Sequence, residues 1–152
     1  MSALGLSRPV AVPGTLRVLA ALLSYPDAGV RGHLPEMLEI LRREGALPVG
    51  RRAELEALIA KLRGDDPLDV EAEYVQLFDR GRGTSLHLFE HVHGDSRDRG
   101  PAMIDLAQTY EKAGLYLAEG QMPDYLPVVL EFTSTQPPRE ARAFLAEMAH
   151  IF

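Results

Sequence analysis

HLPEMLEILRRE, residues 33 to 44, shows most clearly how this chain folds. Its bulky apolar side chains recur at positions i, i+3, i+4 and i+7, which are Leu34, Met37, Leu38 and Leu41. Because an α-helix turns once in about 3.6 residues, these positions share one face and most of the charged residues take the other. Breaks rich in glycine and proline bound the stretch at 26–32 and 45–50. The pattern predicts an amphipathic helix with one buried face.

The same spacing recurs along the rest of the chain, whereas the alternation typical of strands is nearly absent. The further stripes are Leu55, Leu58, Ile59 and Leu62; Val70, Tyr74, Leu77 and Phe78; Met103, Leu106, Ala107, Tyr110 and Leu117; and Ala141, Phe144, Leu145 and Met148. Further breaks at 64–66, 81–83, 94–100 and 120–123 separate the stripes, and Thr15 is a candidate cap for a first helix. We predict an all-α, single-domain bundle of about six to eight helices over residues 1–152, with 1–14 poorly ordered.

Length, composition and charge fit an ordinary globular protein. A chain of 152 residues suits one domain, and its contents of 46% hydrophobic and 25% charged residues are unremarkable for that class. The net charge of -6 argues against nucleic-acid binding, which needs a concentrated basic face. There is no cysteine, so disulfides and thiolate metal sites are excluded. Because no segment reaches the roughly 18 apolar residues needed to span a bilayer, and no signal cleavage site follows the first apolar run, we expect an unprocessed cytoplasmic protein.

A histidine-rich segment, HLFEH at residues 87–91, matches the H-x-x-E-H pattern of the inverted zinc proteases. If 86–93 is helical, His87 and His91 share a face and could bind one zinc ion, with Glu90 as the general base. Against this, a catalytic zinc needs a third protein ligand, and so short a motif also occurs by chance. The glycine at 94 and the charged residues after it favour a structured turn. A zinc-dependent hydrolase is therefore the alternative hypothesis, and we predict neither a metal nor a cofactor.

Residues 73–132 are more specific as a whole than any short motif within them. Three blocks stand out: YVQLFD at 74–79, HVHGDSRDRGPAM at 91–103 and MPDYLPVVLEF at 122–132. With these blocks the chain closely resembles the NarJ-type nitrate reductase assembly chaperones, within the wider TorD/DmsD family of redox-enzyme maturation proteins. Two departures matter: Tyr125 stands where the wider family often has histidine, and the chain stops at Phe152, whereas NarJ-type proteins usually continue for several more helices. We expect a truncated or shortened member.

The resemblance implies a cytoplasmic, all-helical chaperone and not an enzyme. Such proteins bind the N-terminal segment of the molybdenum-containing catalytic (alpha) subunit of nitrate reductase. They assist insertion of the molybdenum cofactor and delay membrane docking until insertion is complete. The implied partner is thus that N-terminal peptide, with no nucleic acid and no direct membrane insertion, and the protein is expected to be a monomer or a weak dimer.

A peptide helix that docks in a groove needs an apolar floor and a charged rim. The residues expected at such a groove fall into two groups. Apolar and aromatic candidates are Tyr74, Leu77, Phe78, Leu86, Phe89, Tyr125 and Pro127; polar candidates are Glu90, His91, His93, Asp95, Arg97, Arg99, Asp124 and Glu131. The carboxylates would meet basic residues of the peptide, and the histidines would make binding sensitive to pH. The two arginines either join this surface or pair with the carboxylates and fix the loop.

Overall fold

The computed structural model describes residues 12–80, 82–93 and 97–151, and the only sheet-like feature in these ranges is one antiparallel bridge between His87 and Tyr125. The nine α-helices of these ranges are α1 Pro13–Leu22, α2 Ala28–Gly32, α3 Leu34–Glu44, α4 Val49–Gly64, α5 Pro67–Tyr74, α6 Phe89–Val92, α7 Arg99–Lys112, α8 Leu126–Ser134 and α9 Pro138–Met148. A π-turn, Val75–Asp79, continues α5, and short 3-10 turns lie at Arg82–Thr84 and Ala149–Ile151. Two of these, α2 and α6, have only five and four residues, which leaves seven longer helices. The prediction of an all-α fold with about six to eight helices is therefore confirmed.

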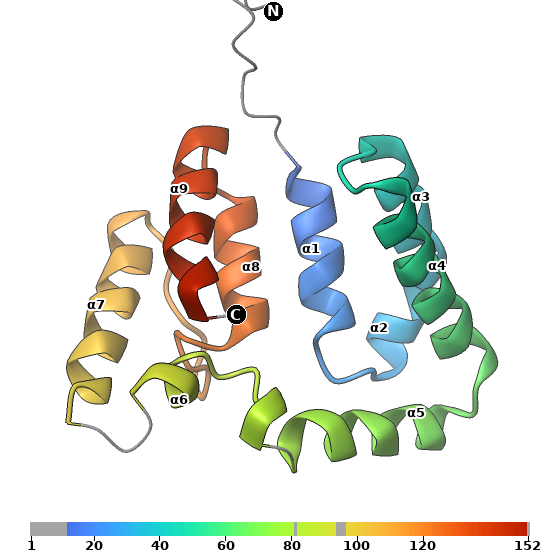
Figure 1. Ribbon diagram of the computed structural model, residues 1–152, viewed down its shortest axis with the longest axis horizontal. Helices are drawn as coiled ribbons and strands as arrows, with labels where there is room; N and C mark the ends of the chain where they lie inside the picture. The colour runs from blue at the N-terminus through green and yellow to red at the C-terminus, as the bar shows by residue number, and fades with distance from the viewer. Residues whose placement is uncertain (1–11, 81, 94–96, 152) are drawn as a thin grey trace, which may run out of the picture.

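The central helix of the molecule is α1 (Figure 1). It packs on α8 on one side and on α3 on the other, so it joins the half that contains α3 and α4 to the half that contains α7, α8 and α9. Along the bottom of Figure 1, α5 runs from the end of α4 towards α6 and connects the two halves a second time. None of the helices in the described ranges is long and apolar enough to cross a bilayer.

Opposite faces of α1 enter different parts of the core. Val18 packs with Leu34, Met37, Leu41 and Ile59 of α3 and α4, which confirms most of the first stripe as a buried face. The other face of α1 packs on Leu130 of α8 through Leu16 and Ala20, and a third cluster consists of Phe89, Leu106, Tyr110 and Phe132. The core is therefore divided into clusters that a single helix connects.

The helix that packs most closely on α1 has no stripe in the sequence. Six of the nine residues of α8 are buried, and apart from Glu131 the helix carries no charged side chain. A helix that is covered on most sides lacks the alternation of apolar and polar faces by which surface helices are recognised. Periodicity alone therefore did not reveal α8.

The start of α1 corrects the expectation for Thr15. Val12 occupies the capping position and Pro13 begins the helix, so Thr15 lies inside the first turn. The cap comes instead from Glu44 at the end of α3, whose carboxylate accepts hydrogen bonds from the Gly14 N–H (2.9 Å), the Thr15 N–H (2.6 Å) and the Thr15 hydroxyl (2.6 Å). Burial acts to raise the pKa of the Glu44 carboxyl, but these hydrogen bonds outweigh it and the pKa is lowered.

Three boundaries also differ from the sequence-based expectations. Residues 13 and 14 of the segment expected to lack order belong to α1, while residues 1–11 lie outside the described residues. The break at 26–32 contains α2, because the Asp27 side chain accepts the Val30 N–H at 2.9 Å and caps a short helix there. At the other end, α7 stops at Lys112, so Leu117 of the fourth stripe lies in the following loop, after Gly114 with a φ of +82°.

Candidate functional site

The second half of the third stripe is a π-turn and not a continuing α-helix. Asp66 and Pro67 start α5, with the Asp66 side chain accepting the Leu68 N–H at 2.9 Å. After α5 the five residues of the π-turn widen the helix, which changes the direction of the side chains. Phe78 packs on Tyr74 with ring centres 4.8 Å apart, whereas Leu77 points outward and is 51% exposed. Such turns occur frequently at functional sites.

Tyr74 connects α5 to the end of α1 and to the start of α8. Its hydroxyl donates to the Leu23 carbonyl at 2.7 Å and lies 2.9 Å from the Tyr125 hydroxyl, and its ring meets the edge of Tyr25. Because the Tyr74 hydrogen is used on the carbonyl, Tyr125 donates to Tyr74. Burial, followed by the contact with Tyr125, raises the pKa of Tyr74 and keeps its hydroxyl neutral. The structure thus brings together two of the residues that we expected at one site.

Asp124 organises the turn that holds Tyr125. Its carboxylate has no exposed surface, and Oδ2 accepts the Phe89 N–H at 3.0 Å. Its backbone carbonyl accepts the Leu88 N–H at 3.0 Å, and two residues later the Leu126 N–H donates to the Leu86 carbonyl at 2.8 Å. These bonds attach residues 86–89 to residues 124–126. A peptide docked on this surface does not reach the buried carboxylate, so we leave Asp124 out of the proposed contact surface.

Ser85 forms hydrogen bonds with three of the polar residues that follow the π-turn. Its hydroxyl accepts the His87 N–H at 3.2 Å and its carbonyl accepts a hydrogen bond from His91 Nε2 at 2.8 Å. The Ser85 hydroxyl also bonds the Glu90 carboxylate, which lies 3.8 Å from Arg99 of α7. The Ser85 bond, with the positive charge of Arg99 and the neighbouring imidazoles, lowers the pKa of Glu90. Arg99 therefore pairs with a carboxylate, as one of its two expected roles requires.

The zinc hypothesis required one helix over 86–93, and the structure has α6 only over Phe89–Val92. His87 precedes this helix, and its Nδ1 faces the buried Asp124 at 3.7 Å. His91 is turned towards the Ser85 carbonyl instead of sharing a face with His87. Among the described residues, no cluster of three or more His, Asp or Glu side chains is placed to hold a metal ion. The geometry on which the hydrolase alternative depends is absent from this segment.

The remaining candidates do not converge on one surface. Leu86, Phe89 and Pro127 are buried, and His93 meets the edge of the Phe89 ring. Arg97 is exposed, and Asp95 lies outside the described residues. The exposed side chain of Glu131 lines a separate pocket of about 190 Å³ beside Tyr116. Tyr74, Leu77, Phe78 and Tyr125 thus form the part of the expected site that the structure gathers around α5.

Beside these residues lies a groove of about 410 Å³ that we call the α5 groove. It is lined by Tyr25, Leu68, Glu71, Ala72, Val75, Gln76 and Arg80. Leu68 is 75% exposed and Tyr25 is 44% exposed, so large apolar side chains face solvent here. A neighbouring hollow is acidic, being lined by Asp65, Asp66, Asp69 and Glu73. Sequence reasoning missed this groove, although Leu68, Ala72 and Val75 at i, i+4 and i+7 indicate a second apolar stripe on the same helix.

Comparison with known proteins finds matches over most of the chain. The model of the family described as nitrate reductase delta subunit matches residues 44–150. The nitrate reductase molybdenum cofactor assembly chaperone NarJ of Escherichia coli K12 is 46% identical over 136 residues, which are 90% of this chain and 58% of that protein. The chain therefore spans less than two thirds of the length of this relative.

Two further similarities concern a longer protein and a solved structure. The nitrate reductase-like protein NarX of Mycobacterium tuberculosis H37Rv is 38% identical over 128 residues, which are 84% of this chain and 19% of that protein. A crystal structure from Archaeoglobus fulgidus, provisionally assigned as a redox enzyme maturation protein, has a TM-score of 0.63 and 24% identity. The match covers 97% of this chain and 86% of that one, and at this identity it shows a shared fold alone.

Proposed function

This chain belongs to the nitrate reductase delta subunit family, and from that membership we propose that it is an assembly chaperone of a nitrate reductase. In this proposal it binds the N-terminal segment of the catalytic subunit and holds that subunit ready for the molybdenum cofactor until membrane docking. The relative from Escherichia coli carries the name of a nitrate reductase molybdenum cofactor assembly chaperone, which supports the assembly role. We place this activity in the cytoplasm and assign it to binding, without a catalytic step.

The observation that carries the proposed binding mode is the exposed apolar surface along α5 and its π-turn. Leu68, Leu77 and Tyr25 leave 75%, 51% and 44% of their surface in water. Leu68 and Tyr25 line the α5 groove together, and contiguous exposed apolar surface marks interaction sites in soluble proteins. We propose that the α5 groove, with Leu77 and the half-buried Tyr74 and Phe78 beside it, receives the apolar face of the peptide.

The charge around this surface supports a peptide with basic residues. Asp65, Asp66 and Asp69 are exposed at the start of α5, and Asp79 is exposed at the end of the π-turn. Glu71 and Glu73 are already paired, with Arg31 at 3.4 Å and with Lys61 at 2.9 Å. The described residues give these four aspartates no ion pair, and their charge would raise the rate of encounter with a basic peptide and add selectivity.

We would test the proposal by calorimetric titration with a synthetic peptide from the start of the cognate catalytic subunit. Leu68→Ser should weaken binding at least about tenfold, because it removes an exposed apolar contact from the α5 groove. Val49→Ser is the matched control, since Val49 on α4 is 74% exposed and lies outside the groove.

Saturable binding that Leu68→Ser weakens and Val49→Ser leaves unchanged would support both the partner and the site. Unchanged affinity in both variants would reject the α5 groove while retaining the partner. If the protein binds no such peptide at tens of micromolar, the chaperone proposal itself is wrong.

A further inference from the structure

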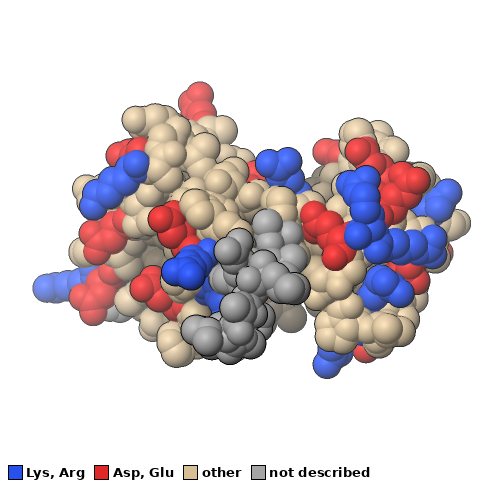
Figure 2. Space-filling model, turned by 90° about the horizontal axis from the view of Figure 1, so that it is seen from above, with Lys and Arg blue, Asp and Glu red and all other residues tan. Residues whose placement is uncertain are grey.

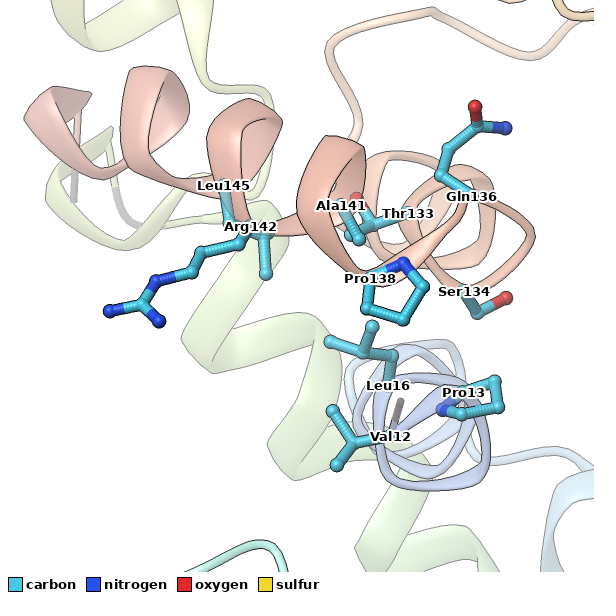
Figure 3. A pocket seen from close by; sticks show the side chains of 10 residues that line it. All are labelled: Val12, Pro13, Leu16, Thr133, Ser134, Gln136, Pro138, Ala141, Arg142 and Leu145. Carbon is cyan, nitrogen blue, oxygen red and sulfur yellow. The ribbon is translucent and has the colours of Figure 1, made fainter. Parts of the chain in front are cut away.

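A second pocket lies at the opposite end of α1, where that helix begins, α8 ends and α9 begins. We call it the helix-end pocket; its volume is about 300 Å³, at the lower end of the range for ligand pockets. Figure 3 shows side chains of α1 facing those of α9, with Arg142 extending outward from α9 at the edge. The lining residues are Val12, Pro13, Leu16, Thr133, Ser134, Gln136, Pro138, Ala141, Arg142 and Leu145.

The floor of this pocket is apolar in effect, because its hydroxyl groups are satisfied within α8. The Thr133 hydroxyl donates to the Val129 carbonyl at 2.7 Å, and the Ser134 hydroxyl donates to the Glu131 carbonyl at 2.5 Å. Leu16 and Leu145 complete the floor from the neighbouring helices. The pocket therefore has room for one or two bulky apolar side chains and offers them carbon surface.

The rim of the helix-end pocket is positive, in contrast to the protein as a whole. None of the described residues that line it carries a carboxylate, although the chain has a net charge of -6 and acidic side chains stand among basic ones on the face seen in Figure 2. Arg142 lines the pocket directly, and Arg17 reaches it from α1 by donating from Nε to the Ser134 hydroxyl at 3.3 Å. Arg139 stands three residues before Arg142 on α9, on the same side of the helix. The described residues give none of these three arginines an ion pair.

From the apolar floor and the cationic rim we infer that the helix-end pocket docks an acidic amphipathic helix of a partner protein. A bulky apolar residue of that helix would enter the pocket, and carboxylates one turn away would meet the guanidinium groups. A protein segment fits better than a single anionic head group, because the arginines come from two helices and several carboxylates are needed to meet them. The ligand inferred here is acidic, whereas the peptide proposed for the α5 groove is basic, so the inference goes beyond the chaperone proposal and does not depend on it.

The full chain can be tested with a synthetic amphipathic helix that has leucine at i, i+3, i+4 and i+7 and glutamate at most other positions. The same peptide with lysine in place of glutamate is the control ligand. We expect Arg142→Glu to weaken binding of the acidic peptide about tenfold, through loss of attraction and added repulsion. Ala141→Met should also weaken it by filling the pocket, whereas Arg63→Glu, an equal charge change at an exposed site on α4, should leave affinity unchanged.

Fluorescence anisotropy with a labelled peptide gives the affinities, and circular dichroism verifies that each variant is folded. The inference would be supported if Arg142→Glu and Ala141→Met weaken binding of the acidic peptide, Arg63→Glu does not, and the lysine peptide binds more weakly. Absence of binding at hundreds of micromolar, or affinities that neither Arg142→Glu nor Ala141→Met changes, would overturn it. Three other outcomes would also overturn it, because each indicates a different occupant of the pocket. Decanoate that binds where the peptide does not would indicate a fatty acid, and a dimer in sedimentation that Arg142→Glu dissociates would indicate a second copy of this chain. Peptide binding that requires removal of residues 1–11 would indicate the chain's own N-terminal segment.

Discussion

The carboxylate of Glu44 provides the sharpest test of how this fold is held together. It lies at the end of α3 and caps the start of α1, thirty residues earlier in the chain, through three hydrogen bonds. Glu44→Ala removes all three acceptor contacts and leaves the first-turn N–H groups of Gly14 and Thr15 without a partner in the protein. Because α1 joins both halves of the molecule, we expect the whole domain to lose stability.

The magnitude follows from the cost of removing a cap and a favourable charge. Loss of a side-chain cap costs about 1 kcal/mol. Loss of a negative charge at a helix N-terminus costs about 0.3–1 kcal/mol more. The free energy of unfolding should therefore fall by about 2 kcal/mol, which lowers the Tm by about 4–8 °C for a domain of this size. Glu44→Gln keeps an acceptor and loses the charge, so it should cost roughly half as much.

The same contacts predict a dependence on pH. Because the folded pKa of Glu44 lies below its unfolded value, the ionised carboxylate stabilises the fold above the ordinary glutamate pKa of about 4.3. That contribution is lost as the pH falls through the lowered pKa. The stability difference between the wild type and Glu44→Gln should therefore be largest near neutral pH and shrink in acid.

Urea denaturation at several pH values measures both effects. The matched control is Glu39→Ala, which removes an exposed glutamate from the same helix. If Glu44→Ala costs no more than Glu39→Ala at pH 7, the carboxylate does not cap α1. A difference between wild type and Glu44→Gln that stays constant down to pH 2 would refute the titration argument.

Three further predictions concern backbone space, a buried acceptor and the tyrosine pair. Gly14→Ala should destabilise the fold by about 1–3 kcal/mol, since the added Cβ meets Oε2 of the capping Glu44 carboxylate at 2.5 Å. Gly50→Ala is the control: Gly50 is also the second residue of its helix but has open space around it, so this change should stabilise the fold by about 0.5–1 kcal/mol. Thermal melts in which both variants shift the Tm in the same direction would contradict this. Asp124→Ala should lower the free energy of unfolding by about 1–3 kcal/mol, because it leaves the buried Phe89 N–H without its acceptor. Asp124→Asn retains an acceptor and should cost less. Equal losses of stability in urea for the two variants would reject the role of Asp124 as acceptor for this N–H. Tyr74→Phe should lower the free energy of unfolding more than Tyr125→Phe, because it breaks two hydrogen bonds instead of one. A double-mutant cycle should give a coupling energy of about 0.5–1 kcal/mol between the two hydroxyl groups, and a coupling of zero would disprove their contact.

The amphipathic helices could be predicted because their signal is local. In α3, Leu34, Met37 and Leu41 are all buried, as their spacing indicated. Ile59 of the second stripe is buried as well, whereas Leu58 beside it remains 38% exposed. A stripe thus identifies the face that turns inward, but the edge of that face depends on which neighbour covers it.

The candidate site was harder to predict for the same reason. The motif blocks contain both Tyr74 and Tyr125, and the structure places their hydroxyl groups in contact. The motifs did not distinguish Leu77, which faces solvent, from Phe89, which fills the core, since both are large and apolar. The π-turn decides this difference for Leu77, and the packing of α6 on α7 and α8 decides it for Phe89.

The sequence by itself determined the class of fold and the family, because helical periodicity acts within a few turns and the motif blocks are continuous in the chain. Only the tertiary structure decided the cap of α1 by Glu44, the burial of Asp124, the acidic hollow beside the α5 groove and the cationic rim of the helix-end pocket. Each of these depends on residues that are far apart in the chain. Their contacts form only when whole helices pack against one another, and the spacing of residues within one helix does not determine how that packing occurs.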